Sequence, residues 1–265
     1  MSALLKDRKH ILALQHVNVR DEIRLLGGAA PDSSVYERDG IFAAVVPSLP
    51  HQTMVNTVTY EPGACLLDGL DGLTKAYDAA GVSSWRVWVP EHDPDTGAAL
   101  EAKGYRLAAR YPFIVLDLAA YEPPDLTGFV YDAEGDMATL GRVNALAYEN
   151  GQGLTAALRT TPPGLDVHLY QAHHDGHPAT VRVCVDHLVD GQLDNGAYFG
   201  ATVPAARGKG LARMLGAATL VDARARGCVT SSAVSSAMGL PVWTAMGYRP
   251  VLNVGAYEPR PLRPS

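Results

Sequence analysis

Two short stretches in distant parts of the chain are almost identical, and they restrict the fold more than any other feature. Residues 102–106 read AKGYR and residues 245–249 read AMGYR. Each stretch lies between an expected short helix and an expected last strand. Upstream, AGV at 80–82 has a counterpart in RGCV at 226–229. Two divergent copies of one unit would explain these matches, and a chance match of short glycine turns is the alternative.

Hydrophobic periodicity in the first half predicts a defined order of elements. One or two helices are expected over 3–26, ended by Gly27 and Gly28. The order is then strand, strand, helix, strand, helix, strand. These segments are 41–47, 54–60, 66–80, 85–89, 95–103 and 105–118, the last of which holds one or two strands.

The second half repeats this order after an interruption. Residues 121–125 (YEPPD) can neither continue a helix nor enter a central strand, so we expect a linker there, with domains at 1–123 and 124–265. Asp175 and Gly176 predict a hairpin turn. The expected strands are 128–132, 167–172, 180–186, 195–203, 229–234 and one from 248, and the expected helices are 136–149, 154–160, 208–226 and 240–246. The fold class is α/β (α+β), with two units that each form a mixed, mostly antiparallel sheet flanked by helices.

Composition excludes several classes of protein. The chain has 265 residues, of which 47% are apolar and 19% charged, as in ordinary globular proteins. The 28 acidic and 22 basic residues give a net charge of −6, which disfavours nucleic acid as a partner. No apolar run reaches the roughly 18 residues of a membrane span, and residues 1–27 carry charges throughout. We therefore expect a cytoplasmic protein without a membrane anchor.

The three cysteines, Cys65, Cys184 and Cys228, lie far apart in the sequence, with no CxxC pattern. This spacing supports neither a disulfide framework nor a zinc ribbon. Cys184 and Cys228 fall in β-type runs, so we expect small core residues there.

The segment with the clearest chemistry is 203–213 (VPAARGKGLAR), a strand that leads into a glycine-containing turn and an amphipathic helix. The first N–H groups of a helix lack intrahelical partners and lie at the positive end of its dipole, so this turn can bind phosphate. Gly208 and Gly210 allow a ligand to approach the backbone, and Arg207, Lys209 and Arg213 add positive charge.

Two known phosphate loops do not fit this segment. A P-loop needs Ser or Thr after Gly-Lys, and a dinucleotide fingerprint needs a glycine at position 213, where Arg stands. The remaining pattern, Arg207-x-x-Gly210-x-Ala212, resembles the pyrophosphate-binding motif of the GNAT acyltransferase superfamily. A second segment, 235–248 (SSAMGLPVWTAMGY), is similar to the family's Ser-x-x-Gly-x-Pro-x-Tyr-x-x-x-Gly-Phe variant, at family spacing. The resemblance covers about 126–260 and implies two GNAT-like units, the first one degenerate.

The resemblance implies an acyl-CoA, usually acetyl-CoA, as co-substrate. It would lie between the fourth and fifth strands of the second unit, with its pantetheine on the strand edge and its diphosphate on the amides of 208–212. The expected cofactor-binding residues are Ala201, Thr202, Val203, Arg207, Gly208, Lys209, Gly210, Leu211, Ala212, Arg213 and Ser236. The family's reaction is direct attack of a neutral amine on the thioester.

The sequence departs from the family pattern at Trp243, where members often carry a Tyr that protonates the departing thiolate. An indole N–H donates hydrogen bonds but is no acid near neutral pH. A thiol of pKa near 8.5 leaves as thiolate at a cost of about 2 kcal/mol at pH 7, so the loss is tolerable. We expect Trp243 to pack against the cofactor, with the thiolate leaving unaided or through Tyr198 or Tyr248.

Glu149 is the first candidate for the general base because it lies where the family forms its acceptor wall; Asp186 and a water molecule are the alternatives. Four histidines, His168, His173, His174 and His177, gather near the expected hairpin, but an exposed turn lacks a supporting shell, so we expect no metal.

The first unit is not expected to bind CoA. Alignment of the two halves on Gly81 and Gly227 puts Glu61 opposite Arg207, and Pro62, which has no N–H, opposite Gly208. We expect this unit to pack against the second one and to help shape the acceptor cleft. The sequence thus predicts an N-acetyltransferase acting on a small-molecule or protein amine, with a non-catalytic acyl-CoA-binding module as the alternative, and leaves a homodimer open.

Overall fold

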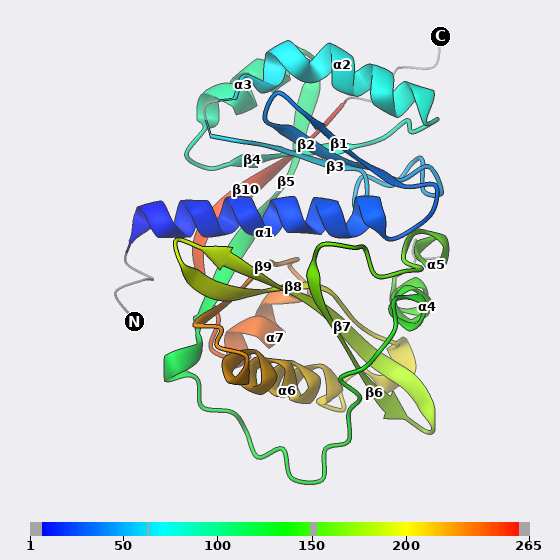
Figure 1. The fold of residues 1–265 in the computed structure, drawn as a ribbon, viewed down its shortest axis with the longest axis vertical. Helices are drawn as coiled ribbons and strands as arrows, with labels where there is room; N and C mark the ends of the chain where they lie inside the picture. Colours follow the sequence, from blue (N-terminus) through cyan, green and yellow to red (C-terminus); the bar gives the residue numbers. More distant parts are fainter. Residues whose placement is uncertain (1–6, 63, 149–152, 260–265) are drawn as a thin grey trace.

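The computed structural model describes residues 7–62, 64–148 and 153–259 (Figure 1). Among the described residues, the first half forms three α-helices, with a single helix in place of the expected one or two over 3–26, together with five strands and one 3-10 turn. In chain order these elements are α1 (Arg8–Gly28), β1 (Ser34–Arg38), β2 (Ile41–Val45), β3 (Thr57–Tyr60), α2 (Leu66–Ala79), β4 (Arg86–Pro90), α3 (Pro94–Ala102), β5 (Tyr105–Asp117) and η2 (Leu118–Ala120).

The second half adds the remaining strands and helices. In chain order these are α4 (Met137–Ala147), α5 (Leu154–Ala157), β6 (Asp166–His174), β7 (His177–Val189), β8 (Gln192–Thr202), η3 (Pro204–Ala206), α6 (Leu211–Ala225), β9 (Thr230–Val234), α7 (Leu240–Ala245) and β10 (Arg249–Pro259). None of the helices in the described part of the chain is both long and apolar enough to cross a membrane.

All ten strands belong to one sheet, in the order β1-β2-β3-β4-β10-β5-β9-β8-β7-β6. The β3–β4 and β8–β9 pairs are parallel and the other neighbours are antiparallel. The last strand of each half pairs with the other half, since β10 lies beside β4 and β5 lies beside β9. The expected mixed, mostly antiparallel sheet flanked by helices is therefore confirmed, as one large sheet. That its halves are copies of one unit, with a boundary at 123/124, stays a prediction.

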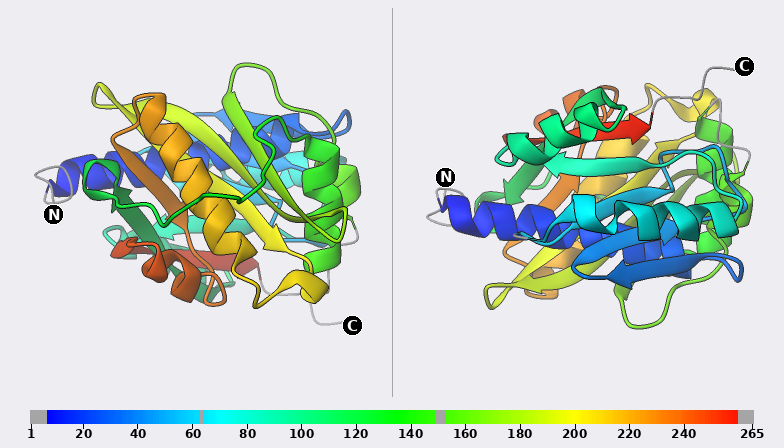
Figure 2. Two further views of the ribbon diagram at one scale, coloured as in Figure 1. Left: turned by 90° about the horizontal axis from the view of Figure 1, so that it is seen from below. Right: turned by 90° about the horizontal axis from the view of Figure 1, so that it is seen from above.

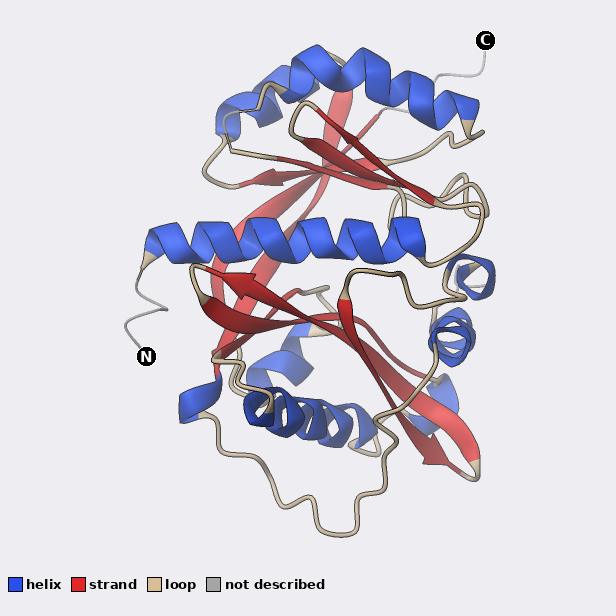
Figure 3. Cartoon of the chain, viewed as in Figure 1, coloured by secondary structure: helices blue, strands red, loops and turns tan. Residues whose placement is uncertain are grey.

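Helix α1 lies at the centre of the molecule, between the strands of the first half and those of the second (Figures 1 and 3). It contacts β2 and β3 on one side and β7, β8 and β9 on the other. The core around α1 also includes α4 and α5. Helices α2 and α3 cover the opposite face of the first-half strands, and α6 and α7 cover that of the second-half strands (Figure 2). Helix α1 thus packs against the strands of both halves.

A buried ionic group fixes α1 to the second half. Nδ1 of His187 on β7 lies 3.3 Å from Oδ2 of Asp21 on α1, and Nε2 lies 3.0 Å from Oδ2 of Asp194 on β8. Both ring nitrogens lie near a carboxylate, an arrangement that favours the imidazolium form. The two carboxylates raise the pKa of His187 to about 9, against the effect of burial.

Several sequence expectations need correction. Residues 128–132 form no strand; one isolated bridge, from Asp132 to Gln171, occurs there. Strand β1 was not expected because its polar residues are largely exposed at the edge of the sheet. Gly27 and Gly28 do not stop a helix before them but form its last turn, where a β-carbon on Gly27 would lie 2.6 Å from the carbonyl oxygen of Ser34. Close packing of the next strand explains that glycine.

Candidate functional site

Strands β8 and β9 separate part of the way along the sheet. Their pairing runs from Asp194–Thr230 to Gly196–Ser232 and then stops, although β8 continues to Thr202. A register shift against β7 follows, and Phe199 within it has a φ of 47°, an uncommon conformation for a residue with a β-carbon. The bulge turns β8 away from β9 and leaves its edge beyond Gly196 without a strand partner on that side.

The loop after β8 ends in an open helix N-terminus. Gly208 and Gly210 have φ values of 75° and 77°, and Gly210 is the N-cap of α6. No side chain caps the helix, and Met214 is the residue whose N–H bonds back to the Gly210 carbonyl, at 3.0 Å. The preceding amides of the first turn therefore have no intrahelical acceptor. A β-carbon on either glycine would meet nothing within 4 Å, so the space before these amides is open.

A cleft of about 650 Å³ joins the open helix start to the gap between the strands. Nine of the eleven predicted cofactor-binding residues line it. They are Ala201, Thr202, Arg207, Gly208, Gly210, Leu211, Ala212, Arg213 and Ser236. Val203 and Lys209 do not, because the Val203 N–H bonds to Ala179 and the Lys209 ammonium contacts Nε2 of His174 on the β6–β7 hairpin.

Arg207 is less available as a free positive charge than the sequence suggested. Its Nε donates to the Thr202 carbonyl at 3.2 Å, and its Nη2 donates to the Ala147 carbonyl at the end of α4, at 2.6 Å. The side chain therefore holds the loop to α4. Arg213, which is exposed and makes no hydrogen bond or ion pair among the described residues, is the freer cation at this end of the cleft.

Trp243 lines the cleft, as expected of a residue that packs against a ligand. Its ring meets the edge of Tyr248 at 4.7 Å between centroids. The guanidinium carbon of Arg182, on β7, lies 4.3 Å from the Trp243 ring centroid. Arg182 also lines the cleft and is only 5% exposed. Its place between two valines of a β-type run carries no sequence motif that marks it as part of a site.

The two tyrosines suggested as proton donors are bound elsewhere. The Tyr248 hydroxyl lies 2.7 Å from Oγ of Ser231, and burial raises its pKa far above the usual range. Tyr198 lines the cleft, but its hydroxyl donates to the Asn18 carbonyl at 3.0 Å, and burial raises its pKa as well. Neither group is a ready acid near pH 7.

Of the proposed bases, Glu149 lies outside the described residues, and Asp186 lies outside the cleft. The Arg226 guanidinium holds both oxygens of Asp186, at 2.6 and 3.0 Å. Together with His168 these contacts hold the pKa of Asp186 well below its usual range, despite partial burial. Such a weak base does not suit proton abstraction from an amine.

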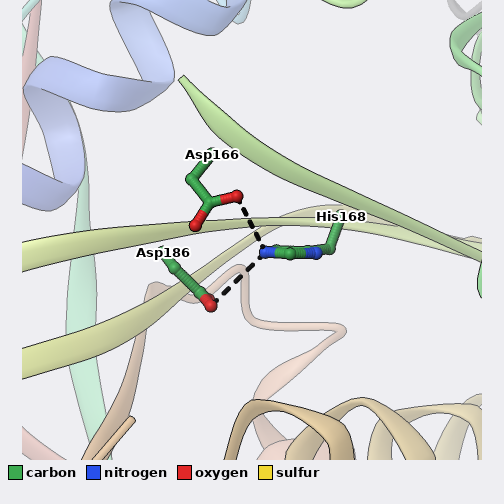
Figure 4. A group of neighbouring side chains, drawn as sticks. All are labelled: Asp166, His168 and Asp186. Atoms are coloured by element: carbon green, nitrogen blue, oxygen red, sulfur yellow. Dashed lines mark ion pairs between the residues drawn. The ribbon is translucent and has the colours of Figure 1, made fainter. Parts of the chain in front are cut away.

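Figure 4 shows His168 between Asp166 and Asp186, with Nε2 at 3.3 and 3.4 Å from the two carboxylates. Among the described residues this is the group with spacing suited to a metal ion. The Arg226 guanidinium already occupies both oxygens of Asp186, so a cation would have to displace it. The arrangement is that of an ion-pair network.

The cleft also contains a carboxyl group, that of Glu22, which no sequence motif marks. Glu22 on α1 is half-buried, lines the cleft, and forms no hydrogen bond or ion pair with the described residues. Burial raises its pKa to about 7, although the positive charge of Arg86 acts to lower it. Glu22 lies one helical turn after Asn18, whose carbonyl holds Tyr198 of β8, so its position is tied to the strand gap.

The wall around Glu22 comes from the first half of the chain. Met54, Arg86, Trp88 and Tyr111 line the cleft from the loop before β3 and from β4 and β5. Trp88 and Tyr111 meet edge to face, and the Arg86 guanidinium stacks on both rings, at 5.2 and 5.9 Å. No sequence motif marks these residues, because they come together only when β4 and β5 join the strands of the second half.

No protein-family model matches the chain, and no curated protein matches its sequence. Solved structures do match. A GCN5-related N-acetyltransferase from Kribbella flavida aligns over 99% of this chain and 97% of its own, with a TM-score of 0.61 and 15% identity. A putative GNAT-family acetyltransferase from Novosphingobium aromaticivorans covers 84% of this chain and 89% of its own, at TM-score 0.52 and 16% identity.

A tandem GNAT protein from the clavulanic acid biosynthesis pathway is also similar, with 89% of this chain and 86% of that chain covered, a TM-score of 0.56 and 14% identity. The parted strands, the glycine turn and the helix after it are thus set in an architecture that known acetyltransferases share. The chain has the fold of the GCN5-related N-acetyltransferase (GNAT) superfamily.

Proposed function

We propose that the chain transfers an acetyl or similar small acyl group from acyl-CoA to an amine. The observation that carries the proposal is the open start of α6, where free amides and two left-handed glycines face a cleft that continues between β8 and β9. A diphosphate needs several N–H donors and positive charge at one point, and this turn offers both.

The residues present fit acyl-CoA along the length of the cleft. The amides from Gly208 to Arg213 would hold the diphosphate, with the Arg213 guanidinium beside it. The unpaired edge of β8 beyond Gly196 would pair with the amides of the pantetheine arm. Bound in this way, acyl-CoA supplies an acyl group activated as a thioester, and its reactive end would lie beside Trp243 and the bulge of β8.

The chemistry asked of the protein is proton removal and charge stabilisation. The amine nitrogen forms a C–N bond to the acyl carbon, the C–S bond breaks with its electron pair on sulfur, and the amine proton passes to the Glu22 carboxylate. A base with a pKa near 7 is half ionised at neutral pH, which suits this task. A β8 amide in the gap would donate to the developing oxyanion.

The acceptor would enter from the side of the first half, against Met54, Trp88 and Tyr111. These side chains suit an amine with an apolar or planar body, since aromatic rings provide large apolar surfaces. The net charge of −6 favours a cationic acceptor such as a polyamine, an aminoglycoside, an amino-acid derivative or a protein amine. A cytoplasmic setting, where acyl-CoA is available, is part of the proposal.

Two measurements test the proposal. Calorimetric titration with CoA and with acetyl-CoA should show binding, and a thiol assay with a panel of amines should show CoA released in step with acylated amine. Absence of binding would reject the acyl-CoA site. Binding without thiol release for any amine would favour the alternative, an acyl-CoA-binding module without catalysis.

A further inference from the structure

Arg182 is a buried positive charge without an anionic partner among the described residues. Two other half-buried arginines have partners: Arg226 pairs with Asp186 at 2.6 Å, and Arg86 lies 3.4 Å from Glu258. Arg182 is more deeply buried than either, yet no carboxylate of the described chain pairs with it. Burial of an unpaired charge is costly, so an arginine kept in this state is expected to meet an anion that the described residues do not supply.

The contacts of Arg182 hold it in one place at the cleft. Nη1 donates to Oγ1 of Thr219 on α6 at 3.2 Å, and the guanidinium lies against the Trp243 ring at 4.3 Å. Its Nε and Nη2 form no hydrogen bond with the described residues. Because Arg182 lines the cleft, these two donors are the ones left for a ligand.

The position of Arg182 along α6 indicates which part of the ligand it meets. Thr219 lies eight residues after Leu211, which is about 12 Å along the helix axis. The guanidinium is therefore too far from the open helix start to share the diphosphate. It lies instead beside Trp243, at the end of the cleft where the strands separate and where the thioester would react.

We infer that Arg182, held against the Trp243 ring, stabilises the sulfur of CoA as a thiolate, so that the leaving group departs as an anion. This inference rests on the proposed function. The C–S bond breaks with both electrons on sulfur, and the charge is balanced by a guanidinium already in place. No proton donor is then needed at this position.

This arrangement explains why a residue that is no acid can stand at position 243. Neither an indole N–H nor a guanidinium gives up a proton near neutral pH, so the pair acts by charge alone. The face of the Trp243 ring attracts the cation and fixes its orientation, a role for which the indole is the best side chain. Trp243 is in this sense a positioning residue, and Arg182 is the group that touches the sulfur.

The test compares CoA with desulfo-CoA, which lacks the thiol, by calorimetric titration of the full chain between about pH 6 and about pH 9.5. The thiol of an unperturbed cysteine has a pKa of about 8.5, and a site that prefers thiolate lowers the pKa of a bound thiol. We expect the ratio of the two dissociation constants, desulfo-CoA to CoA, to rise about tenfold across this range for each unit by which binding lowers the thiol pKa.

Other titrating groups are controlled in this design. Among the described residues, the groups that interact electrostatically with Arg182 are Tyr121 after η2, Cys184 on β7 and Tyr248 just before β10, and burial raises the pKa of each. Glu22, elsewhere in the cleft, titrates near 7. Its charge acts on a thiolate but not on desulfo-CoA, so the ratio is also measured in Glu22→Gln, where a rise that remains is due to other groups.

Variants then assign the effect. Arg182→Met should abolish the rise, and Arg182→Lys, which keeps the charge, should retain most of it. Arg213→Met, at the diphosphate end, should weaken both probes alike and leave the ratio unchanged. If Arg182→Met does not fold, Arg182→Gln takes its place as the neutral variant, and a flat ratio in the wild type still overturns the thiolate role.

Each outcome has one meaning. A flat ratio in the wild type, with both probes bound, overturns the thiolate role while leaving CoA binding intact. A rise that persists in Arg182→Met also overturns it, because another group would then be responsible. If neither probe binds at any pH, the proposed function itself fails.

Discussion

In each half of the molecule, the first strand of a parallel pair is followed by a loop and a helix. The two loops, after β3 and after β8, are built differently. After β8, Gly208 and Gly210 leave amides open to the cleft. After β3, the Glu61 N–H donates to the Gly40 carbonyl at 2.7 Å, and Pro62 has no N–H to offer. A β-carbon on Gly40 would lie 2.9 Å from the side chain of Ala64, so the β1–β2 turn packs directly on the loop after β3.

This difference indicates a division of roles within one sheet. The second half carries the loop suited to a diphosphate, whereas the first half carries a carboxylate, Glu61, that would repel one. The first half instead contributes Glu22 and an aromatic wall to the cleft. The comparison predicts that its residues act on the acceptor and that those of the second half act on CoA.

The largest expected effect is that of Glu22→Gln. Removal of the general base should lower kcat/KM by about 10²- to 10⁴-fold, with little change in CoA affinity. In the wild type, kcat/KM should rise with pH up to an apparent pKa of about 7, because the carboxylate must be ionised to accept the proton. A pH–rate profile of both proteins, with turnover measured by thiol release, tests this.

Glu101→Gln, on the exposed surface of α3, provides the matched control and should leave the profile unchanged. If Glu22→Gln keeps the acidic limb, the base is another group and the assignment of chemistry to the first half is wrong. If Glu22→Gln weakens CoA binding as strongly as turnover, the two halves do not divide the work.

Most of the fold and half of the candidate site could be predicted from local sequence patterns. The segment 207–212 is contiguous, so its glycines and its helix start can be recognised without a structure. The order of strands and helices followed from periodicity for the same reason. The exchange of β5 and β10 could not be foreseen, because pairing between distant strands depends on tertiary packing that no local pattern encodes.

The other half of the site has no local signature. Glu22 lies on a helix whose other charged residues look like an ordinary solvated face, and only the placement of α1 between the halves brings it into the cleft. Arg182 lies between two valines of β7, and the other charged groups of that strand, Asp186 and His187, pair elsewhere. The residues that line the cleft around each of them come from separate elements, which the sequence does not bring together.

The second prediction concerns the ionic group that joins the halves. The pKa of His187 is about 9 in the folded chain and near 6.5 when unfolded, so its contribution to stability is complete below pH 6.5 and is lost as pH rises through 9. The loss should reach about 3 kcal/mol. Urea unfolding near pH 6.5 and pH 9.5 measures it, and His187→Gln should remove most of the difference, with a smaller part left from Glu22, whose pKa is about 7.

His173→Gln, on the exposed β6–β7 hairpin, is the control and should keep the wild-type pH dependence. A single unfolding transition is expected, since α1 and the exchanged strands bind the halves together. Two separate transitions would show that the halves unfold independently. The differences between their loops would then be differences between two independent domains.

The smallest expected effect is that of Gly210→Ala in the loop after β8. This change introduces the residue found at the matching position of the loop after β3, which is Ala64. The φ of 77° at Gly210 makes a β-carbon cost about 1–2 kcal/mol, and the added methyl lies before the open amides. CoA affinity should fall about tenfold, the equivalent of roughly 1.4 kcal/mol. Gly176→Ala, at the same φ of 77° in the β6–β7 turn outside the cleft, should cost similar stability and leave CoA affinity unchanged. Equal losses of affinity in both variants would mean that backbone strain alone is responsible, and the open loop after β8 would then have no special part in binding.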